Sequence, residues 1–378
     1  MEIKQIYSLV NEATNEALGV EGLVQENLSN IVEVGNAVFN ANAMDKYVKA
    51  LVNRIGKIIF VNRVYEGSAP SVLMDGWEYG SVMQKVSMGL PEATENETWE
   101  LTDGQSYDPH IFHAPKGVVA KYYNKYVTFE IDMSFTENQL KMSFNSVTEL
   151  NGFISMLYTQ VENSMTVKLD ELIRRTINNM IAETVHTNNG ARAINLLTLY
   201  KSAYPADTTI TAATALNNKD FIRFAAYIIK VTHGRMRTMS TVFNEGNQPR
   251  HTPTDMSHIV LLEDFASGAD VFLQSDTFHN ELSALPTAER VPYWQGSGTS
   301  YAFADVSKIN VKTAAGNVVE QGGILGVMFD RWALGVANIE RKVTSQYTPN
   351  AEFFTNFYKY KAAYFNDFNE NFVVFFVA

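Results

Sequence analysis

Apolar and polar positions recur with two different periods along this chain, and together they predict both helices and strands. Between about residues 146 and 187 the apolar side chains come in steps of three and four, without a proline, as in an amphipathic helix. Such a helix would be about 50–60 Å long, beyond the usual globular length, so it indicates a structural spine. Its apolar positions are Phe153, Met156, Leu157, Val161, Met165, Leu169, Leu172, Ile173, Ile177, Met180 and Ile181.

A strict alternation of apolar and polar residues at 127–135 predicts a half-buried strand directly before this helix. Two dense apolar runs, at 324–329 and 332–337, predict two further strands. Asp330 and Arg331 lie between them, and we expect a tight reversal there. Shorter strands are expected at 258–262 and 307–311.

Helical spacing returns in three other places, which together with the strands predicts an α+β fold. A second good helix is expected at 218–239, and a weaker helical pattern covers 44–58. Residues 3–35 predict an arm with short helical pieces, because glycines interrupt the pattern. Helices and strands do not alternate as in βαβ units, so a doubly wound sheet is not expected.

The last 28 residues hold 11 aromatic side chains and finish in an apolar run at 372–378. Chain ends are usually polar and frayed unless they are tied down. Aromatic and β-branched residues favour a packed sheet, so we expect this end to be buried as a strand. Gly322, Gly323 and Gly326 precede or lie in the strand at 324–329, where glycine allows close packing.

Glycine and proline interrupt residues 64–117, where no helical period survives. Loops of this length are uncommon in compact domains and suggest a functional excursion. Six acidic residues fall there with no Lys or Arg between them: Glu92, Glu95, Glu97, Glu100, Asp103 and Asp108. The stretch fits either a solvated acidic loop or an extended hairpin that lies on a neighbouring subunit.

Composition narrows the class of protein. An apolar fraction of 46% suffices for a sizeable core, and the net charge of −11 argues against a nucleic-acid reader but not against a protein that encloses nucleic acid. The chain has no cysteine, so disulfides and thiolate chemistry are excluded. No secretory signal or membrane-spanning apolar run is visible, and we expect folding in a cytoplasm.

The motifs of common enzyme chemistry are missing from the sequence. Neither of the two phosphate-binding glycine patterns, G-x-x-x-x-G-K and G-x-G-x-x-G, occurs, and no G-x-S-x-G elbow is present. His110 and His113 form a close pair without a marked third ligand, so no metal or cofactor is expected. Paired carboxylates leave no local signature, and an enzyme using Glu263 and Asp264 stays open as an alternative.

Four stretches resemble segments of the major capsid proteins of tailed double-stranded DNA bacteriophages, the Hong Kong 97-type capsid fold. They are ALVNRIG at 50–56, DFIRFAA at 220–226, FDRWALGV at 329–336 and FYKYKAAY at 357–364. The order of elements resembles that fold as well. The resemblance covers nearly the whole chain and carries no catalytic signature.

The resemblance implies a division of the chain into five parts. They are an N-terminal arm at 1–60, an extended loop at 61–126, a peripheral domain at 127–200 with the spine helix, an axial domain at 201–337, and return strands of the peripheral domain at 338–378. It also implies assembly as hexamers and pentamers into an icosahedral head. That head would enclose double-stranded DNA without sequence-specific binding, in a virion assembled in the cytoplasm of a host bacterium.

Partners implied by the resemblance are other copies of the chain, a scaffolding protein, a portal protein and, in some members, a decoration protein. Contacts between subunits are expected to pair Glu95, Glu97 and Glu100 with Arg174 and Arg175. Some members cross-link neighbours through lysine, but nothing marks a lysine in or near this loop as reactive. An encapsulin shell, with the same fold and an enzyme cargo, is the nearest alternative to the phage head.

Overall fold

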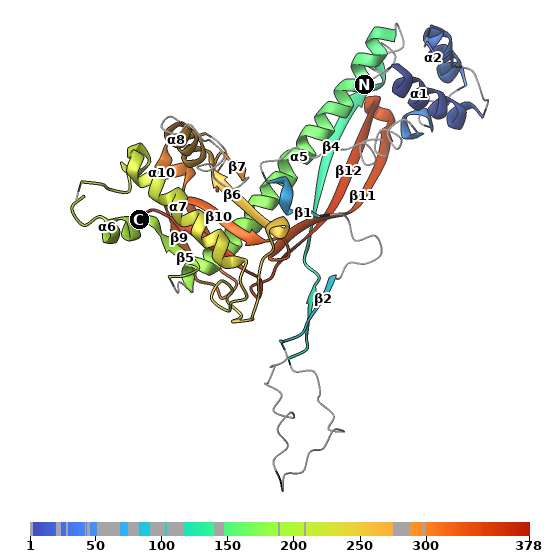
Figure 1. Cartoon of the computed structure of the whole chain (residues 1–378). Helices are drawn as coiled ribbons and strands as arrows, with labels where there is room; N and C mark the ends of the chain where they lie inside the picture. The colour runs from blue at the N-terminus through green and yellow to red at the C-terminus, as the bar shows by residue number, and fades with distance from the viewer. Residues whose placement is uncertain are drawn as a thin grey trace. The chain divides into compact units, whose positions relative to one another are not determined.

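The computed structural model describes most of the chain, in two compact units that are treated separately (Figure 1). One unit comprises residues 1–78, 126–173 and 336–363, and the other comprises 79–125, 174–335 and 364–378. The described residues are 3–19, 24–27, 29–41, 43, 46–50, 69–74, 83–90, 103, 117–139, 147–187, 190–207, 209–274, 288–296 and 299–378.

The first unit contains the N-terminal helices and a four-stranded sheet. Helices α1 (Ile3–Leu18) and α2 (Ile31–Asn40) confirm the expected helical pieces of the arm. The sheet runs in the order β1-β11-β12-β4, with β1 at Leu73–Met74, β4 at Tyr126–Thr136, β11 at Leu334–Thr348 and β12 at Phe353–Asn366. Two short 3-10 helices, Pro70–Val72 and Pro349–Ala351, precede β1 and β12.

Strand β4 has the half-buried alternation that its sequence predicts. It pairs antiparallel with β12 over eleven positions, so that Ile131 lies opposite Tyr358 and Phe135 opposite Phe354. The Phe135 and Phe354 rings are stacked with their centroids 5.6 Å apart. Aromatic pairs on facing strands fix the register, because a slip by one residue would turn every side chain to the other face.

The predicted spine is observed as α5, one continuous helix of 40 residues at Val147–His186 (Figure 1). Its described side chains are buried where the period of three and four predicts, with Val161, Ile173, Ile177 and Ile181 all fully inaccessible. The expected apolar positions Phe153, Met156 and Leu157 lie where side chains are not described. Burial follows one stripe over 161–172, and further along the helix Arg174, Thr176 and Asn178 are buried as well.

The second unit is built on a five-stranded sheet in the order β5-β13-β10-β6-β7. The strands are β5 (Ala193–Asn195), β6 (Ser257–Leu262), β7 (Glu289–Val291), β10 (Ile324–Asp330) and β13 (Phe372–Phe376). Strands β8 (Ile309–Lys312) and β9 (Val318–Gln321) form a two-stranded ribbon. Strands β2 (Met83–Ser87) and β3 (Val119–Tyr123) form another.

Helices pack on this sheet and complete the core of the unit. They are α6 (Leu196–Ala203), α7 (Lys219–Met236), α8 (Glu263–Gln274) and the short α10 (Phe303–Val306), with 3-10 turns at Ala215–Asn217 and Thr254–Met256. The predicted second helix is α7, which Asn218 caps by accepting a 3.0 Å hydrogen bond from the Phe221 amide. Phe221, Ala225 and Ile229 of α7 join Phe265 of α8 in one apolar cluster.

The C-terminal run is buried, as its aromatic content predicts. Strand β13 lies inside the five-stranded sheet, antiparallel to β10 and parallel to β5. Phe372 to Val377 are all buried, and Val377 donates a 2.8 Å backbone hydrogen bond to the Gly323 carbonyl. The last strand is therefore a central strand of a core that earlier elements surround.

One expectation from the sequence is met only in part. A tight turn follows β10, closed by a 2.8 Å hydrogen bond from the Ala333 amide to the Asp330 carbonyl. It does not form a hairpin, because β10 belongs to the five-stranded sheet and β11 to the four-stranded one. The backbone amide of Asp330 donates to Asn371 and that of Arg331 to Met256, so distant segments also hold the turn.

The α+β class is confirmed. One parallel crossover, β6–α8–β7, is present, but the sheet is mixed and is not doubly wound.

Candidate functional site

The most distinctive surface feature of the second unit is the ribbon formed by β2 and β3. The two strands are antiparallel, with Lys85 opposite Lys121 and Val86 opposite Ala120. Successive side chains of a strand point to opposite faces, so the ribbon has two different sides. We call the side with Gln84, Val86, Ala120 and Tyr122 the outward face, because all four are exposed.

The opposite side of the ribbon is held by ion pairs that we call the hairpin anchor. The Lys85 ammonium lies 2.7 Å from a carboxylate oxygen of Asp367 and 2.7 Å from one of Glu370. Lys121 contacts the second Asp367 oxygen at 2.8 Å. Arg250 lies 3.4 Å from Glu370 and completes the cluster.

The two carboxylates of the anchor come from the loop between β12 and β13. Backbone bonds fix this loop, since Asp367 donates to the Ala333 carbonyl at 2.7 Å and the Phe368 carbonyl accepts from Glu245 and Gly246. Asn371, which follows, donates to the Thr252 hydroxyl at 3.1 Å. The carboxylates are therefore presented from a rigid platform, and Asp367 is only 2% exposed.

The charge state of Asp367 follows from its partners. Burial by itself would raise the pKa of this carboxyl, but hydrogen bonds from Lys121 and Lys85 outweigh burial and hold the pKa below its ordinary value. The Tyr123 phenol, next to the anchor on β3, has its pKa raised by burial and by the charge of Asp367. The lysines of the anchor thus favour the ionised form of the Asp367 carboxylate.

Most of the exposed side chains on the outward face are apolar or aromatic. The exposed fractions are 60% for Val86 and 63% for Tyr122, and Met88 and Val118 beside them are also exposed. Gln84 donates a 3.2 Å hydrogen bond to the Tyr122 hydroxyl, which ties the two strands across this face. Contiguous exposed apolar side chains of this kind mark surfaces that other proteins cover.

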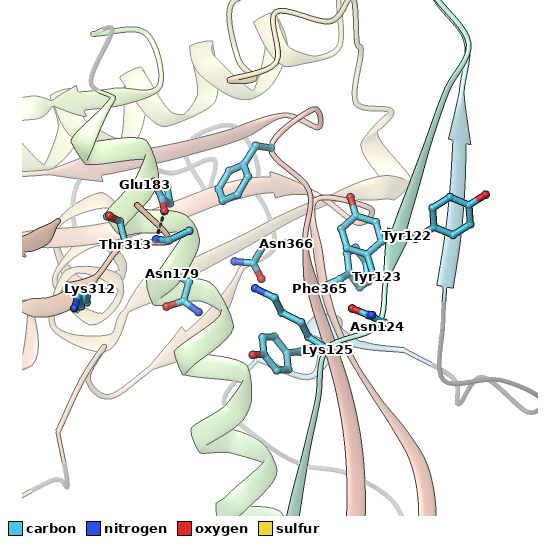
Figure 2. A pocket seen from close by; sticks show the side chains of 13 residues that line it. Tyr122, Tyr123, Asn124, Lys125, Asn179, Glu183, Lys312, Thr313, Phe365 and Asn366 are labelled. Atoms are coloured by element: carbon cyan, nitrogen blue, oxygen red, sulfur yellow. Dashed lines mark hydrogen bonds between the residues drawn. The ribbon is translucent and has the colours of Figure 1, made fainter. Parts of the chain in front are cut away.

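A cleft of about 420 Å³ lies beside the ribbon in the same unit (Figure 2). Tyr122, Tyr123 and Lys125 line it from one side, and Asn179 and Glu183 of α5 line it from another. Among the described residues that line the cleft, Glu183 is the one carboxylate, and it accepts a 2.7 Å hydrogen bond from the Ala314 amide. The cleft therefore lacks the pair of carboxylates that acid–base hydrolysis would need.

The contact residues expected from the sequence are only partly visible. Glu95, Glu97 and Glu100 lie outside the described residues. Arg174 is buried, with its guanidinium 4.4 Å from the centre of the Tyr293 ring. Arg175 is exposed and lies 5.3 Å from the centre of the Tyr364 ring. Arg175 is accessible to another molecule, whereas Arg174 takes part in the packing of its own chain.

The residues considered for enzyme or metal chemistry are only partly among those that the structure describes. His110 and His113 lie outside the described residues, and the described part of the chain has no group of three or more side chains that could hold a metal ion. Glu263 accepts hydrogen bonds from Ser267 and Arg290, and neither Glu263 nor Asp264 lines the cleft beside the ribbon. Within the same described part, no helix has the length and apolarity to cross a membrane.

A comparison with protein families decides what kind of protein carries this ribbon. Residues 8–376 match the family described as Phi29-like phage major capsid protein. The chain belongs to the Phi29-like phage major capsid protein family. The resemblance expected from the sequence is therefore confirmed, and the protein is a structural component of a phage head. Comparison with curated proteins found no matching relative.

Solved phage structures are similar to this capsid protein at low identity. The capsid of Staphylococcus phage Andhra matches with 9% identity and a TM-score of 0.49, covering 81% of this chain and 83% of the other. The capsid of cyanophage P-SCSP1u matches with 11% identity and a TM-score of 0.46, covering 83% and 88%. A structure of the head fibre and inner core protein of bacteriophage P68 matches with 10% identity, a TM-score of 0.49, and coverage of 81% and 83%.

The hairpin anchor is the part of this capsid protein that sequence reasoning missed. Lys85 and Asp367 are 282 positions apart, and Lys121 and Asp367 are 246 apart. The local sequence shows only that Lys85 and Lys121 alternate with apolar residues in short strands. Such lysines are usually solvated, and no local pattern indicates that two of them share one buried carboxylate.

Proposed function

We propose that this capsid protein assembles as hexamers and pentamers into the icosahedral head that encloses the phage double-stranded DNA. The family match over residues 8–376 is the observation that carries the proposal. The net charge of −11 supports enclosure without sequence-specific binding, because an acidic protein does not adhere to phosphate. The mature protein would reside in the virion after assembly in the cytoplasm of the host bacterium.

The outward face of the β2–β3 ribbon is the contact that we assign to a second copy of the chain. A two-stranded ribbon is marginally stable alone, and its apolar outward face is costly to leave in water. A closed shell needs repeated heterologous contacts between identical subunits. Val86 and Tyr122 supply exposed apolar and aromatic area of the kind that such contacts bury.

The remaining parts of the proposal follow the domain division expected from the sequence. Residues 1–60 would reach a neighbour as an arm, 127–200 with the return strands at 338–378 would form the peripheral domain, and 201–337 would form the axial domain near the five- or six-fold axis. A scaffolding protein during assembly, a portal protein and a decoration protein are the further partners. The family match favours this phage head over an encapsulin shell.

The first experiment is negative-stain electron microscopy of the protein expressed alone and with its scaffolding protein, backed by sedimentation. Closed shells, tubes or ring-shaped capsomers are the expected products. A monodisperse monomer at every salt and protein concentration, with and without the scaffold, would contradict the proposal.

The contact itself is tested by placing a charge on the outward face. Val86→Asp should leave the subunit folded and prevent shell formation, because a carboxylate cannot be buried against apolar groups without cost. Val318→Asp is the matched control, since Val318 is a similarly exposed valine (68%) on the other ribbon, β8–β9. Normal shells from Val86→Asp would remove this ribbon face from the subunit contact.

A further inference from the structure

Two lysines stand directly opposite each other on the inner side of the β2–β3 ribbon. Lys85 and Lys121 are register partners in an antiparallel pair, so their side chains leave the same face within about 5 Å of each other. Like charges at such positions destabilise a strand pair. An anion between the two ammonium groups therefore stabilises the ribbon.

Asp367 supplies that anion in a geometry that few other positions could reproduce. One carboxylate oxygen accepts from Lys85 at 2.7 Å and the other accepts from Lys121 at 2.8 Å. The Asn369 amide also donates to Asp367 at 3.1 Å and holds the carboxylate in place. The side chain bridges both strands at once, so it fixes the rotation of the ribbon as well as its distance from the body.

The Lys85 ammonium group is fully used by the body of the unit. Its three hydrogens have three acceptors: Asp367 at 2.7 Å, Glu370 at 2.7 Å and the Trp332 carbonyl at 3.2 Å. An ammonium with three fixed acceptors has one preferred place. Lys85 therefore locates β2, while Lys121, which is 35% exposed, adds the second point that stops β2 from turning.

We propose that Asp367 is a positioning residue for assembly, holding Lys85 and Lys121 so that the outward face is presented to the neighbouring copy at one fixed angle. The inference rests on the proposed contact through that face. Buried ion pairs seldom add net stability, because desolvation offsets the attraction, but they do specify one arrangement among several. Asp367 would thus act on the uniformity of the shell more than on the stability of the fold.

The test compares Asp367→Asn with the wild type in two measurements. Hydrogen exchange in unassembled subunits reports on the ribbon, and negative-stain microscopy reports on the particles. Asp367→Asn leaves Glu370 beside Lys85 but removes the only described carboxylate that contacts both lysines. Amides of 83–87 and 119–123 should then exchange on the order of tenfold faster, with those of β4 and β13 unchanged. The particles should become irregular in diameter, or open sheets.

A second variant separates the pairing of the ribbon from its attachment through Asp367. In the double variant Asp367→Asn with Lys121→Glu, Lys85 and the carboxylate introduced at position 121 attract each other across the strands. The ribbon can then pair while Lys85 keeps only Glu370 and the Trp332 carbonyl as partners on the body. Irregular particles from this variant are expected. Uniform shells would overturn the inference, because they would show that the bridge through Asp367 is not needed. Lys168→Met is the matched control, since it removes an exposed ion pair on α5 in which Lys168 lies 2.9 Å from Glu171.

Two outcomes distinguish this inference from the proposed contact. Normal shells and unchanged ribbon exchange in Asp367→Asn would overturn the positioning role and leave the outward-face contact standing. Normal shells from Val86→Asp would contradict the contact itself. If Asp367→Asn does not fold, Lys121→Arg and Lys121→Met keep the test decisive: the charge-retaining variant should give uniform shells, and the neutral one should broaden the diameter distribution. Equal distributions would refute the role.

Discussion

Gly323 offers the sharpest test of how the end of the chain is packed. Its φ of +71° lies in the left-handed region, and a Cβ added there would come within 1.9 Å of the Val377 carbonyl oxygen. That oxygen belongs to the backbone at the end of β13, so no flexible side chain can move aside. The same segment is held by the 2.8 Å hydrogen bond from the Val377 amide to the Gly323 carbonyl.

Substitution by alanine should therefore be costly. A non-glycine residue in this backbone region costs about 1–3 kcal/mol, and displacing packed backbone adds about 1–3 kcal/mol. We expect Gly323→Ala to lower the free energy of unfolding by about 2–6 kcal/mol, a large part of the total of a typical domain. For a folding unit of about 150–250 residues this corresponds to a Tm lower by about 4–24 °C.

The measurement is thermal unfolding of the unassembled subunit, followed by circular dichroism, for Gly323→Ala and Gly322→Ala. Gly322 is the adjacent residue, and a Cβ there would meet nothing within 4 Å. The Gly322 variant should unfold within about 2 °C of the wild type, as surface substitutions do. Equal Tm values for the two variants would refute the reasoning, because of the two glycines only Gly323 has a left-handed backbone and a close contact with the Val377 carbonyl.

Three further predictions concern the same unit. Burial, and to a smaller extent the charge of Arg331, lowers the pKa of His258 in the folded protein. The stability that neutral His258 contributes is therefore complete above the ordinary histidine pKa and is lost as the pH falls below it. The free energy of unfolding should depend less on pH between 7.5 and 5 in His258→Gln than in the wild type. Trp294→Phe removes the 2.9 Å hydrogen bond to the Ile324 carbonyl and should cost about 1–3 kcal/mol in urea unfolding. Arg174→Met should lower the Tm, because it removes a buried cation from the Tyr293 ring. Arg175→Met should leave the Tm unchanged. A larger fall in Tm for Arg175→Met than for Arg174→Met would contradict the assigned burial.

Elements with a long and regular pattern could be predicted from the sequence. The spine helix, the strand at 127–135 and the buried C-terminal run all have a period or a composition that one kind of packing explains. The path from β10 to β11 could not be predicted. Asp330 and Arg331 do lie in a tight turn, but their backbone amides donate to Asn371 and Met256, which no local pattern identifies.

The sheet to which each C-terminal strand belongs shows the same limit. The resemblance implies return strands at 338–378, and the structure places β12 in the four-stranded sheet and β13 in the five-stranded one. Both strands are rich in aromatic residues, so composition does not distinguish them. What differs is the partner strand, and partner choice depends on contacts far away in the chain.

The candidate site was accessible to sequence reasoning only in outline. The stretch 64–117 stands out because its glycines, prolines and acids fit no compact element. In the structure, β2 lies within this stretch and its partner β3 begins directly after it. The anchor was not predictable, since it depends on a carboxylate that is buried for reasons of tertiary structure. Lys85 and Lys121 become informative only after the register places them opposite each other.

The pattern of the ribbon also specifies which of its faces can point outward. Turned over, the ribbon would bring Val86 and Tyr122 onto Asp367 and Glu370, and the buried Asp367 carboxylate would lose both of its lysine partners. The same rotation would place Lys85 and Lys121 on the surface that we assign to a neighbouring copy, where a pair of like charges opposes burial. Each face thus excludes the wrong orientation by a separate penalty, and the alternation of lysine with apolar residues in β2 and β3 encodes both. A variant with lysines on both faces would keep the anchor but lose the contact with the neighbouring copy. For the same reason, Val86→Asp, which adds a charge to the outward face, and Asp367→Asn, which neutralises the anchor, should give different assembly products.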